Sequence, residues 1–166
     1  MKIIILTILF ICTQLNAEIL LPKLLQNKLI GTWKSDKELT SKFNRENAIL
    51  KKKQSTFLES VTGFLTVEYK KDGTVKSFIP KKTYIFNKKE IKMEEWKDTQ
   101  KLKVLGYTSS SIVIESENEY FGKTVSIIHF ETDDIYWMYL SDCHTNVHAR
   151  EYFKKIKTVE PTVVEE

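Results

Sequence analysis

The sequence predicts an all-β protein, an up-and-down antiparallel β-barrel of about eight to ten strands. Short segments with alternating apolar and polar residues recur from Gly63 onward, and turn residues such as Asp72-Gly73 separate them. Because no long crossover segments intervene, we expect a meander of hairpins, which removes its exposed edges by closing on itself. The expected strands lie around Trp33 and at residues 64–69, 74–79, 83–86, 90–96, 102–107, 111–115, 123–131, 135–141 and 147–156.

The two ends of this chain are expected to meet. The first expected strand contains Gly31-Thr32-Trp33, and the last contains Arg150-Glu151-Tyr152. A meander that closes places its first strand beside its last. We therefore expect these two segments to pair and to close the barrel.

A short N-terminal helix is expected before the first strand. Residues 18–27 contain Pro22, a residue tolerated at the start of a helix, followed by helix-forming residues. Leucines form an apolar stripe along this segment, at positions Leu20, Leu21, Leu24 and Leu25. We expect this helix to plug one end of the barrel.

A helical insertion is expected directly after the first strand. Apolar residues recur at helical spacing over residues 37–61, which predicts one or two helices with a break around residues 44–47, where helix propensity drops. Ser35 and Glu38 have the spacing of a capping box, so we expect Ser35 to cap the helix start. Since the insertion has one apolar face, it must lie against the rest of the protein.

Length and composition suit one compact domain, expected at residues 18–156, with a loose polar tail at 157–166. The preceding residues 1–17 have a basic start, an apolar run and a final alanine, which is typical of a secretory signal. We therefore expect an exported protein, periplasmic or secreted. The apolar run is too short to span a bilayer.

Charge and cysteine content exclude several classes of protein. The net charge is +4, but the lysines are spread along the chain, so we expect no nucleic-acid binding. Cys12 would leave with the signal, so Cys143 has no intrachain partner and we expect no disulfide framework. The alternative, a lipoprotein modified at Cys12, has bulky residues where such signals carry small ones. We expect a monomer.

Three motifs resemble the calycin superfamily, which comprises lipocalins and fatty-acid-binding proteins. Gly31-Thr32-Trp33 matches the Gly-x-Trp signature of the first strand, and Arg150 lies where lipocalins place a basic residue. Thr132-Asp133 resembles part of the lipocalin turn motif, although Asp134 replaces its tyrosine. The chain looks most like a bacterial lipocalin-like domain, and its helical insertion resembles the lid of the fatty-acid binders.

This resemblance implies two roles for Arg150. Gly31, Trp33 and Arg150 would form the structural signature, with the guanidinium stacked on the indole. Alternatively, the Arg-x-Tyr of fatty-acid binders implies that Arg150 and Tyr152 grip a ligand carboxylate. Residues two apart share a face of a strand, so these two side chains point the same way.

Polar and aromatic residues on the expected strands would give the barrel wall the mixed lining of a ligand pocket. The sequence does not decide whether the interior is open or packed. The candidate ligand-binding residues are Arg150, Tyr152, Tyr69, Ser77, Tyr84, His129, Trp137 and Tyr139.

A cluster of polar residues, Asp142, Cys143, His144 and His148, suggests a nucleophile or a metal site. Cys143 and His144 are neighbours in an expected hairpin loop rather than residues facing each other across a cleft. We therefore expect no catalytic residues, no metal and no cofactor.

Two functions remain open. The first is an exported carrier that binds a small apolar or amphipathic molecule, including a carboxylate, in the barrel interior. The second is a protein–protein interaction module with a filled barrel, which uses its loops and helical insertion.

The N-terminus of the exported protein tests the expected signal. Cleavage after Ala17 should leave Glu18 as the first residue, because a small residue closes the signal. N-terminal sequencing of the protein from its own host checks this. A lipid-bearing start at Cys12 would contradict it.

Overall fold

The computed structural model describes residues 21–86, 89–118, 122–140 and 148–156. Within these ranges the chain forms three helices and eleven strands. The helices are α1 (Lys23–Leu29), α2 (Lys37–Asn47) and α3 (Lys52–Val61). The strands are β1 (Gly31–Ser35), β2 (Thr66–Tyr69), β3 (Thr74–Ile79), β4 (Lys82–Phe86), β5 (Lys89–Met93), β6 (Trp96–Lys101), β7 (Lys103–Tyr107), β8 (Ser111–Asn118), β9 (Gly122–Phe130), β10 (Ile135–Tyr139) and β11 (Arg150–Ile156).

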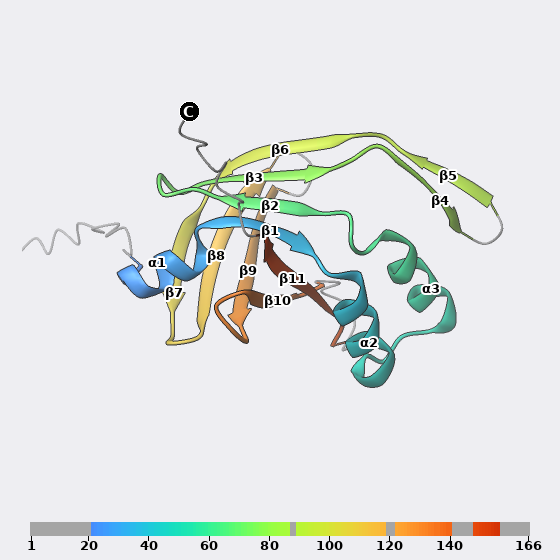
Figure 1. Ribbon diagram of the computed structural model, residues 1–166, viewed down its shortest axis with the longest axis horizontal. Helices are drawn as coiled ribbons and strands as arrows, with labels where there is room; N and C mark the ends of the chain where they lie inside the picture. Colours follow the sequence, from blue (N-terminus) through green and yellow to red (C-terminus); the bar gives the residue numbers. More distant parts are fainter. Residues whose placement is uncertain (1–20, 87–88, 119–121, 141–147, 157–166) are drawn as a thin grey trace, which may run out of the picture.

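Nine antiparallel strands form one sheet in the order β6-β3-β2-β1-β11-β10-β9-β8-β7, and this sheet curls into a nearly closed barrel (Figure 1). β1 lies between β2 and β11, with Trp33 opposite Lys155. The expected pairing of the first and last strands is therefore confirmed. The two edge strands, β6 and β7, are consecutive in the chain and are separated only by Leu102.

β4 and β5 form a separate two-stranded ribbon that extends beyond the barrel (Figure 1). Here one prediction was wrong: residues 90–96 are not one barrel strand. β5 ends at Met93, and a further strand, β6, begins at Trp96 and pairs with β3. The sequence of β6 is almost entirely polar after Trp96, so it shows no alternation, and its pairing with β3 decides its structure.

The core fills the end of the barrel that α1 closes. Trp33 is fully buried, and its indole N–H donates a hydrogen bond to the carbonyl oxygen of Leu29 at 2.8 Å. The Trp33 ring lies 4.7 Å from the ring of Tyr136. The side chains of the core cluster are Leu25, Leu29, Trp33, Val67, Tyr69, Ile112, Ile114, Ile128, Phe130, Tyr136 and Phe153.

α1 places Leu25 and Leu29 in the core, so the expected plug is present. The helix runs two residues beyond the predicted end at Asn27. Leu24 is 67% exposed and does not belong to the buried stripe, because the stripe that faces the barrel continues through Leu29 instead. Leu20 lies outside the described residues.

The insertion forms two helices, which is one of the two expected alternatives. The expected break at residues 44–47 was wrong: these residues form the last turn of α2, and the break lies at residues 48–51. The predicted cap was wrong. The carboxylate of Asp36 caps α2 by accepting a hydrogen bond from the Leu39 N–H at 2.9 Å. Ser35 is still part of β1; its hydroxyl donates to Glu151 and accepts from the Gly63 N–H. Because Ser35 is the last residue of β1 and its hydroxyl bonds to Glu151 and Gly63, Asp36 is the residue that caps α2.

Gly31 has a backbone requirement at the entrance to β1. Its φ of +133° lies where side chains are rarely tolerated, and a Cβ there would meet Lys155 Cε at 2.8 Å. Lys155 crosses this position because its ammonium donates hydrogen bonds to the carbonyls of Asn27 and Lys28, near the end of α1. The glycine therefore allows the last strand to hold the helical plug.

Substitution of two tryptophans tests the position of the core. Trp33→Ala should cost about 3–5 kcal/mol of unfolding free energy, because it empties a fully buried site. Trp96→Ala should cost clearly less, since Trp96 is only half-buried at the start of the edge strand β6. Urea midpoints of the two variants measure the difference; equal losses would contradict this account of the core.

Candidate functional site

The eight predicted ligand-binding residues do not line one interior pocket. Five of them lie on the outer face of the strands β9, β10 and β11: His129, Trp137, Tyr139, Arg150 and Tyr152. The other three are dispersed. Tyr69 belongs to the core, Ser77 lies on the inner face of β3 opposite Asp98, and Tyr84 lies on the ribbon.

Strand alternation explains why Arg150 and Tyr152 lie outside. Tyr136 and Phe153 are directly opposite each other in the β10–β11 ladder, and both are buried in the core with stacked rings 4.7 Å apart. Successive side chains point to opposite faces of a sheet. Arg150 and Tyr152 therefore share a face, as expected, but that face is the outer one.

Arg150 belongs to a cluster of five planar groups from four elements, α2, β9, β10 and β11. Its guanidinium carbon lies 3.6 Å from the ring centre of Trp137 on β10 and 4.3 Å from that of Phe43 on α2. On the other side of Trp137, the imidazole of His129 stacks at 4.0 Å. Tyr139 meets Trp137 edge-on at 5.1 Å. We call Phe43, His129, Trp137, Tyr139 and Arg150 the arginine stack.

The predicted stacking of Arg150 on Trp33 was wrong. Trp33 lies inside the barrel, and the cation over its ring is Lys155, whose ammonium lies 5.1 Å from the ring centre. The strand register explains why Lys155, and not Arg150, lies over Trp33. Trp33 is opposite Lys155, whereas Arg150 is opposite Tyr139.

α2 fixes the backbone under the arginine stack. β1 ends at Ser35, so the first residues of β11 lack a strand on that side. The Asn44 side chain replaces it, accepting from the Arg150 N–H at 2.9 Å and donating to the Arg150 carbonyl at 2.8 Å. Thr40, one turn earlier, accepts from the Tyr152 N–H at 2.9 Å. These bonds place Phe43 against the guanidinium.

The sequence gives little signal for the contribution of α2. Phe43 appears there only as one apolar residue of a helix, and Thr40 and Asn44 appear as ordinary polar ones. The one usable signal is the spacing of Thr40 and Asn44, which places both on one helix face. That spacing does not reveal that a strand edge lies opposite.

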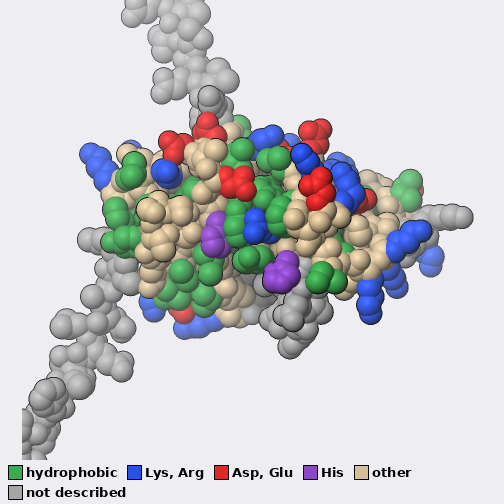
Figure 2. Space-filling view, turned by 90° about the horizontal axis from the view of Figure 1, so that it is seen from below, with side chains coloured by type: hydrophobic (Ala, Val, Ile, Leu, Met, Phe, Trp, Pro, Cys, Tyr) green, Lys and Arg blue, Asp and Glu red, His purple; other side chains and the backbone are tan. Residues whose placement is uncertain are grey.

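Two polar atoms of the arginine stack are buried without a hydrogen-bond partner among the described residues: Nε of Arg150 and Nε2 of His129. The Arg150 Nη1 lies 3.5 Å from the Tyr152 hydroxyl, and no acidic side chain among the described residues forms an ion pair with Arg150. Within the described part of the chain, the guanidinium charge is therefore met by aromatic faces and by no ion-paired carboxylate. Burial raises the pKa of the adjacent Tyr152 hydroxyl, and the nearby carboxylate of Glu131 raises it further. Figure 2 shows histidine side chains among hydrophobic ones on the face seen from below.

The surroundings of His129 favour its neutral form. Burial lowers the pKa of the His129 imidazole, and the positive charge of Arg150 lowers it further. Its Nδ1 lies 2.9 Å from the Ser111 hydroxyl. A neutral imidazole stacks on Trp137 without adding a second positive charge beside Arg150.

Of the predicted polar cluster, Asp142, Cys143 and His144 lie outside the described residues, whereas His148 is described and exposed. Within the described part of the chain, no group of three or more histidine, cysteine, aspartate or glutamate side chains has metal-site geometry. None of the helices in that part has the length and apolar character needed to cross a membrane.

Comparison with known proteins adds no relative. No protein-family model matches this sequence, and no curated protein or solved structure is significantly similar to it.

The pH dependence of His129 tests the electrostatics of the stack. Because its pKa in the folded protein is lowered, His129 should favour folding above about pH 6.5, its ordinary pKa. This contribution should be lost as the pH falls from there through the lowered value. Proton NMR titration should show the His129 pKa rising in Arg150→Met, but only part of the way, since burial remains. An unchanged pKa would show that the charge of Arg150 does not act on His129.

Proposed function

We propose that this protein is a non-catalytic binding protein that holds the anionic head of a small amphipathic molecule at Arg150. The single observation that carries the proposal is the arginine stack, a cation fixed between two aromatic rings with no acidic partner among the described residues. The proposal keeps the carboxylate ligand expected from the sequence and moves its site to the outer face of the barrel.

The chemistry of the guanidinium favours an anion with two or more oxygens. Arginine presents N–H donors in a planar fork that matches a carboxylate or a phosphate. Here the guanidinium carbon packs against the rings of both Trp137 and Phe43, so little side-chain entropy remains to be lost on binding. An anion would also supply the charge partner that the described side chains do not.

The surroundings of Arg150 favour a ligand with an apolar part. Tyr139 is 47% exposed, and it borders Trp137 on the same face. Ligand sites combine mostly apolar and aromatic surface with a few placed polar groups. An alkyl chain or ring attached to the anion would lie against these rings.

A ligand in the barrel interior, the carrier expected from the sequence, has less support. The α1 end is filled by core side chains. Beyond the core, Glu151 lies on the inner face of β11, and burial raises the pKa of its carboxyl group. An acidic group beside the core would disfavour a second carboxylate there.

Two wider proposals accompany this one. The pairing of β1 with β11 supports a lipocalin-like protein of the calycin type. Export is proposed on the basic start, apolar run and final alanine of residues 1–17. The filled core also favours the alternative of a protein–protein interaction module, in which Ile49 and Phe57 of the helical insertion are exposed at 75% and 45%.

Titration with a fluorescent fatty acid tests the role of Arg150. The wild type should bind it, and Arg150→Gln should weaken binding by about ten- to a hundredfold, because a charged hydrogen bond is lost. The matched control is Arg45→Gln, since Arg45 is exposed and paired with Glu59 at 3.4 Å. The methyl ester of the same probe should bind both Arg150 forms equally.

Three results would contradict the proposal. They are no binding by the wild type, equal loss in the Arg45→Gln control, and equal binding by wild type and Arg150→Gln. Circular dichroism of each variant confirms that the barrel is intact, which separates a lost ligand contact from a lost fold.

A further inference from the structure

The outer face of β8, β9 and β10 carries apolar side chains next to the arginine stack. Alternate residues of these three strands are buried in the core: Ile112, Ile114, Ile128, Phe130 and Tyr136. Because successive side chains point to opposite faces of a sheet, the residues that alternate with them point outward. We call four apolar residues of this outward set the outer strip: Val113, Val125, Ile127 and Tyr139.

Register and ring contacts join the outer strip to the arginine stack. Arg150 on β11 is directly opposite Tyr139 on β10. The Tyr139 ring lies 6.2 Å from the imidazole of His129 on β9. Ile127 lies two residues before His129 and therefore on the same face. Val113 on β8 is directly opposite Ile127. The strip thus leads from the guanidinium across β10 and β9 to β8.

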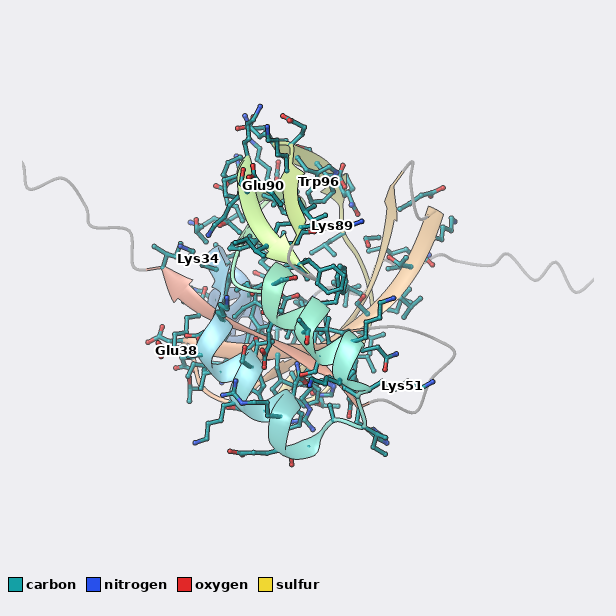
Figure 3. All side chains as sticks on the ribbon, turned by 90° about the vertical axis from the view of Figure 1, so that its right-hand side faces the viewer. Lys34, Glu38, Lys51, Lys89, Glu90 and Trp96 are labelled. Carbon is teal, nitrogen blue, oxygen red and sulfur yellow. The ribbon has the colours of Figure 1, made fainter. Side chains whose placement is uncertain are left out.

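The outer strip is open to solvent. Val125 is 59% exposed, Tyr139 47% and Ile127 38%. Gly106 on β7 is directly opposite Val113, and a Cβ atom at Gly106 would meet no atom of the described residues within 4 Å. No side chain of β7 therefore covers this end of the strip. Figure 3 shows β8 and β9 at the right of the view, apart from α2, α3 and the β4–β5 ribbon.

The outer strip is uncharged, although the sequence contains 26 lysine and arginine residues. Charges on this face return beyond Val113, where Glu115 pairs with Lys103 at 3.8 Å. The outer face of β1 and β11 is different, because Lys34 and Lys154 are directly opposite each other there. An apolar surface that begins at an arginine has the pattern of an amphipathic anion, with a charge at one end and an apolar chain behind it.

We propose that the outer strip holds the apolar chain of an amphipathic anion whose head is bound at Arg150. This inference rests on the proposed function and adds the class of ligand, an anion with an extended chain rather than a compact acid. Arg150 and Val113 are three strands apart, about 14 Å along the sheet, so only an extended chain reaches Val113. Four side chains are too few for a protein partner, since a stable interface needs about 800 Å² from each side.

Two alkyl sulfonates of different chain length test this inference, because a sulfonate stays anionic throughout the neutral range. The full chain should bind dodecanesulfonate at least about tenfold more tightly than butanesulfonate, since the longer chain buries more apolar surface. Ile127→Ser should weaken dodecanesulfonate binding by about fivefold and leave butanesulfonate binding unchanged. Isothermal titration calorimetry below the micelle-forming concentration measures both affinities.

A second variant adds a charge instead of removing a contact. Gly106→Asp places a carboxylate in the open space beside Val113, and it should also weaken the binding of dodecanesulfonate alone. The matched control is Ile85→Ser, because Ile85 is 74% exposed on β4 and lies outside the strip. This control should bind both sulfonates like the wild type. Circular dichroism of each variant confirms that the fold is intact.

The outcomes separate failure of this inference from failure of the proposed function. Equal affinity for the two sulfonates, with both affinities reduced in Arg150→Gln, would overturn the outer strip and leave the anion site in place. Equal losses in Ile127→Ser and Ile85→Ser would do the same. Affinity that rises with chain length but is unchanged in Arg150→Gln would overturn the proposed function and the arrangement of head and chain. No binding of either sulfonate would overturn both.

Discussion

The pairing of β1 with β11 is the constraint on which the rest of the structure depends. It joins segments more than a hundred residues apart, from Thr32 opposite Ile156 to Ser35 opposite Phe153. Where β1 ends, the chain turns into α2, and Asp36 still donates its N–H to the Tyr152 carbonyl. Thr40 and Asn44 then satisfy the strand edge that β1 leaves open. Beyond the end of β1, side chains of α2 thus form the hydrogen bonds to the edge of β11 that a longer β1 would form.

The register of this pairing also decides which chemistry faces which side. A shift by one residue would exchange the two faces of β11 and place Arg150 inside the barrel. With the observed register, Phe153 enters the core and Glu151 faces the interior beside Ser35, whereas Arg150 meets Trp137 and Phe43 outside. The candidate site therefore lies on the outer face because the register turns Arg150 and every second residue of β11 outward.

The sequence was sufficient for features that depend on local patterns. Alternation and turn residues predict most of the strands, and apolar spacing predicts one or two helices in residues 37–61. It was insufficient where a residue far away in the chain decides the local structure. The polar strand β6 forms because β3 pairs with it. Asp36 caps α2 in place of Ser35, because the Ser35 hydroxyl already forms hydrogen bonds with Glu151 and with the Gly63 N–H. The neighbours of Arg150 likewise come from α2 and β10, which no local pattern connects.

The other charged side chains of β11 show why Arg150 is exceptional. Lys154 pairs with Asp36 at 2.6 Å, and Lys155 donates to carbonyls of α1. Glu151 accepts a hydrogen bond from Ser35. Each of these contacts ties β11 to a neighbouring element. Within the described residues Arg150 alone on this strand has neither an acidic nor a carbonyl partner for its side chain. Among the described residues, the other charges of β11 are all held by neighbouring elements, and the guanidinium of Arg150 is the one that neither an acidic side chain nor a carbonyl oxygen pairs with.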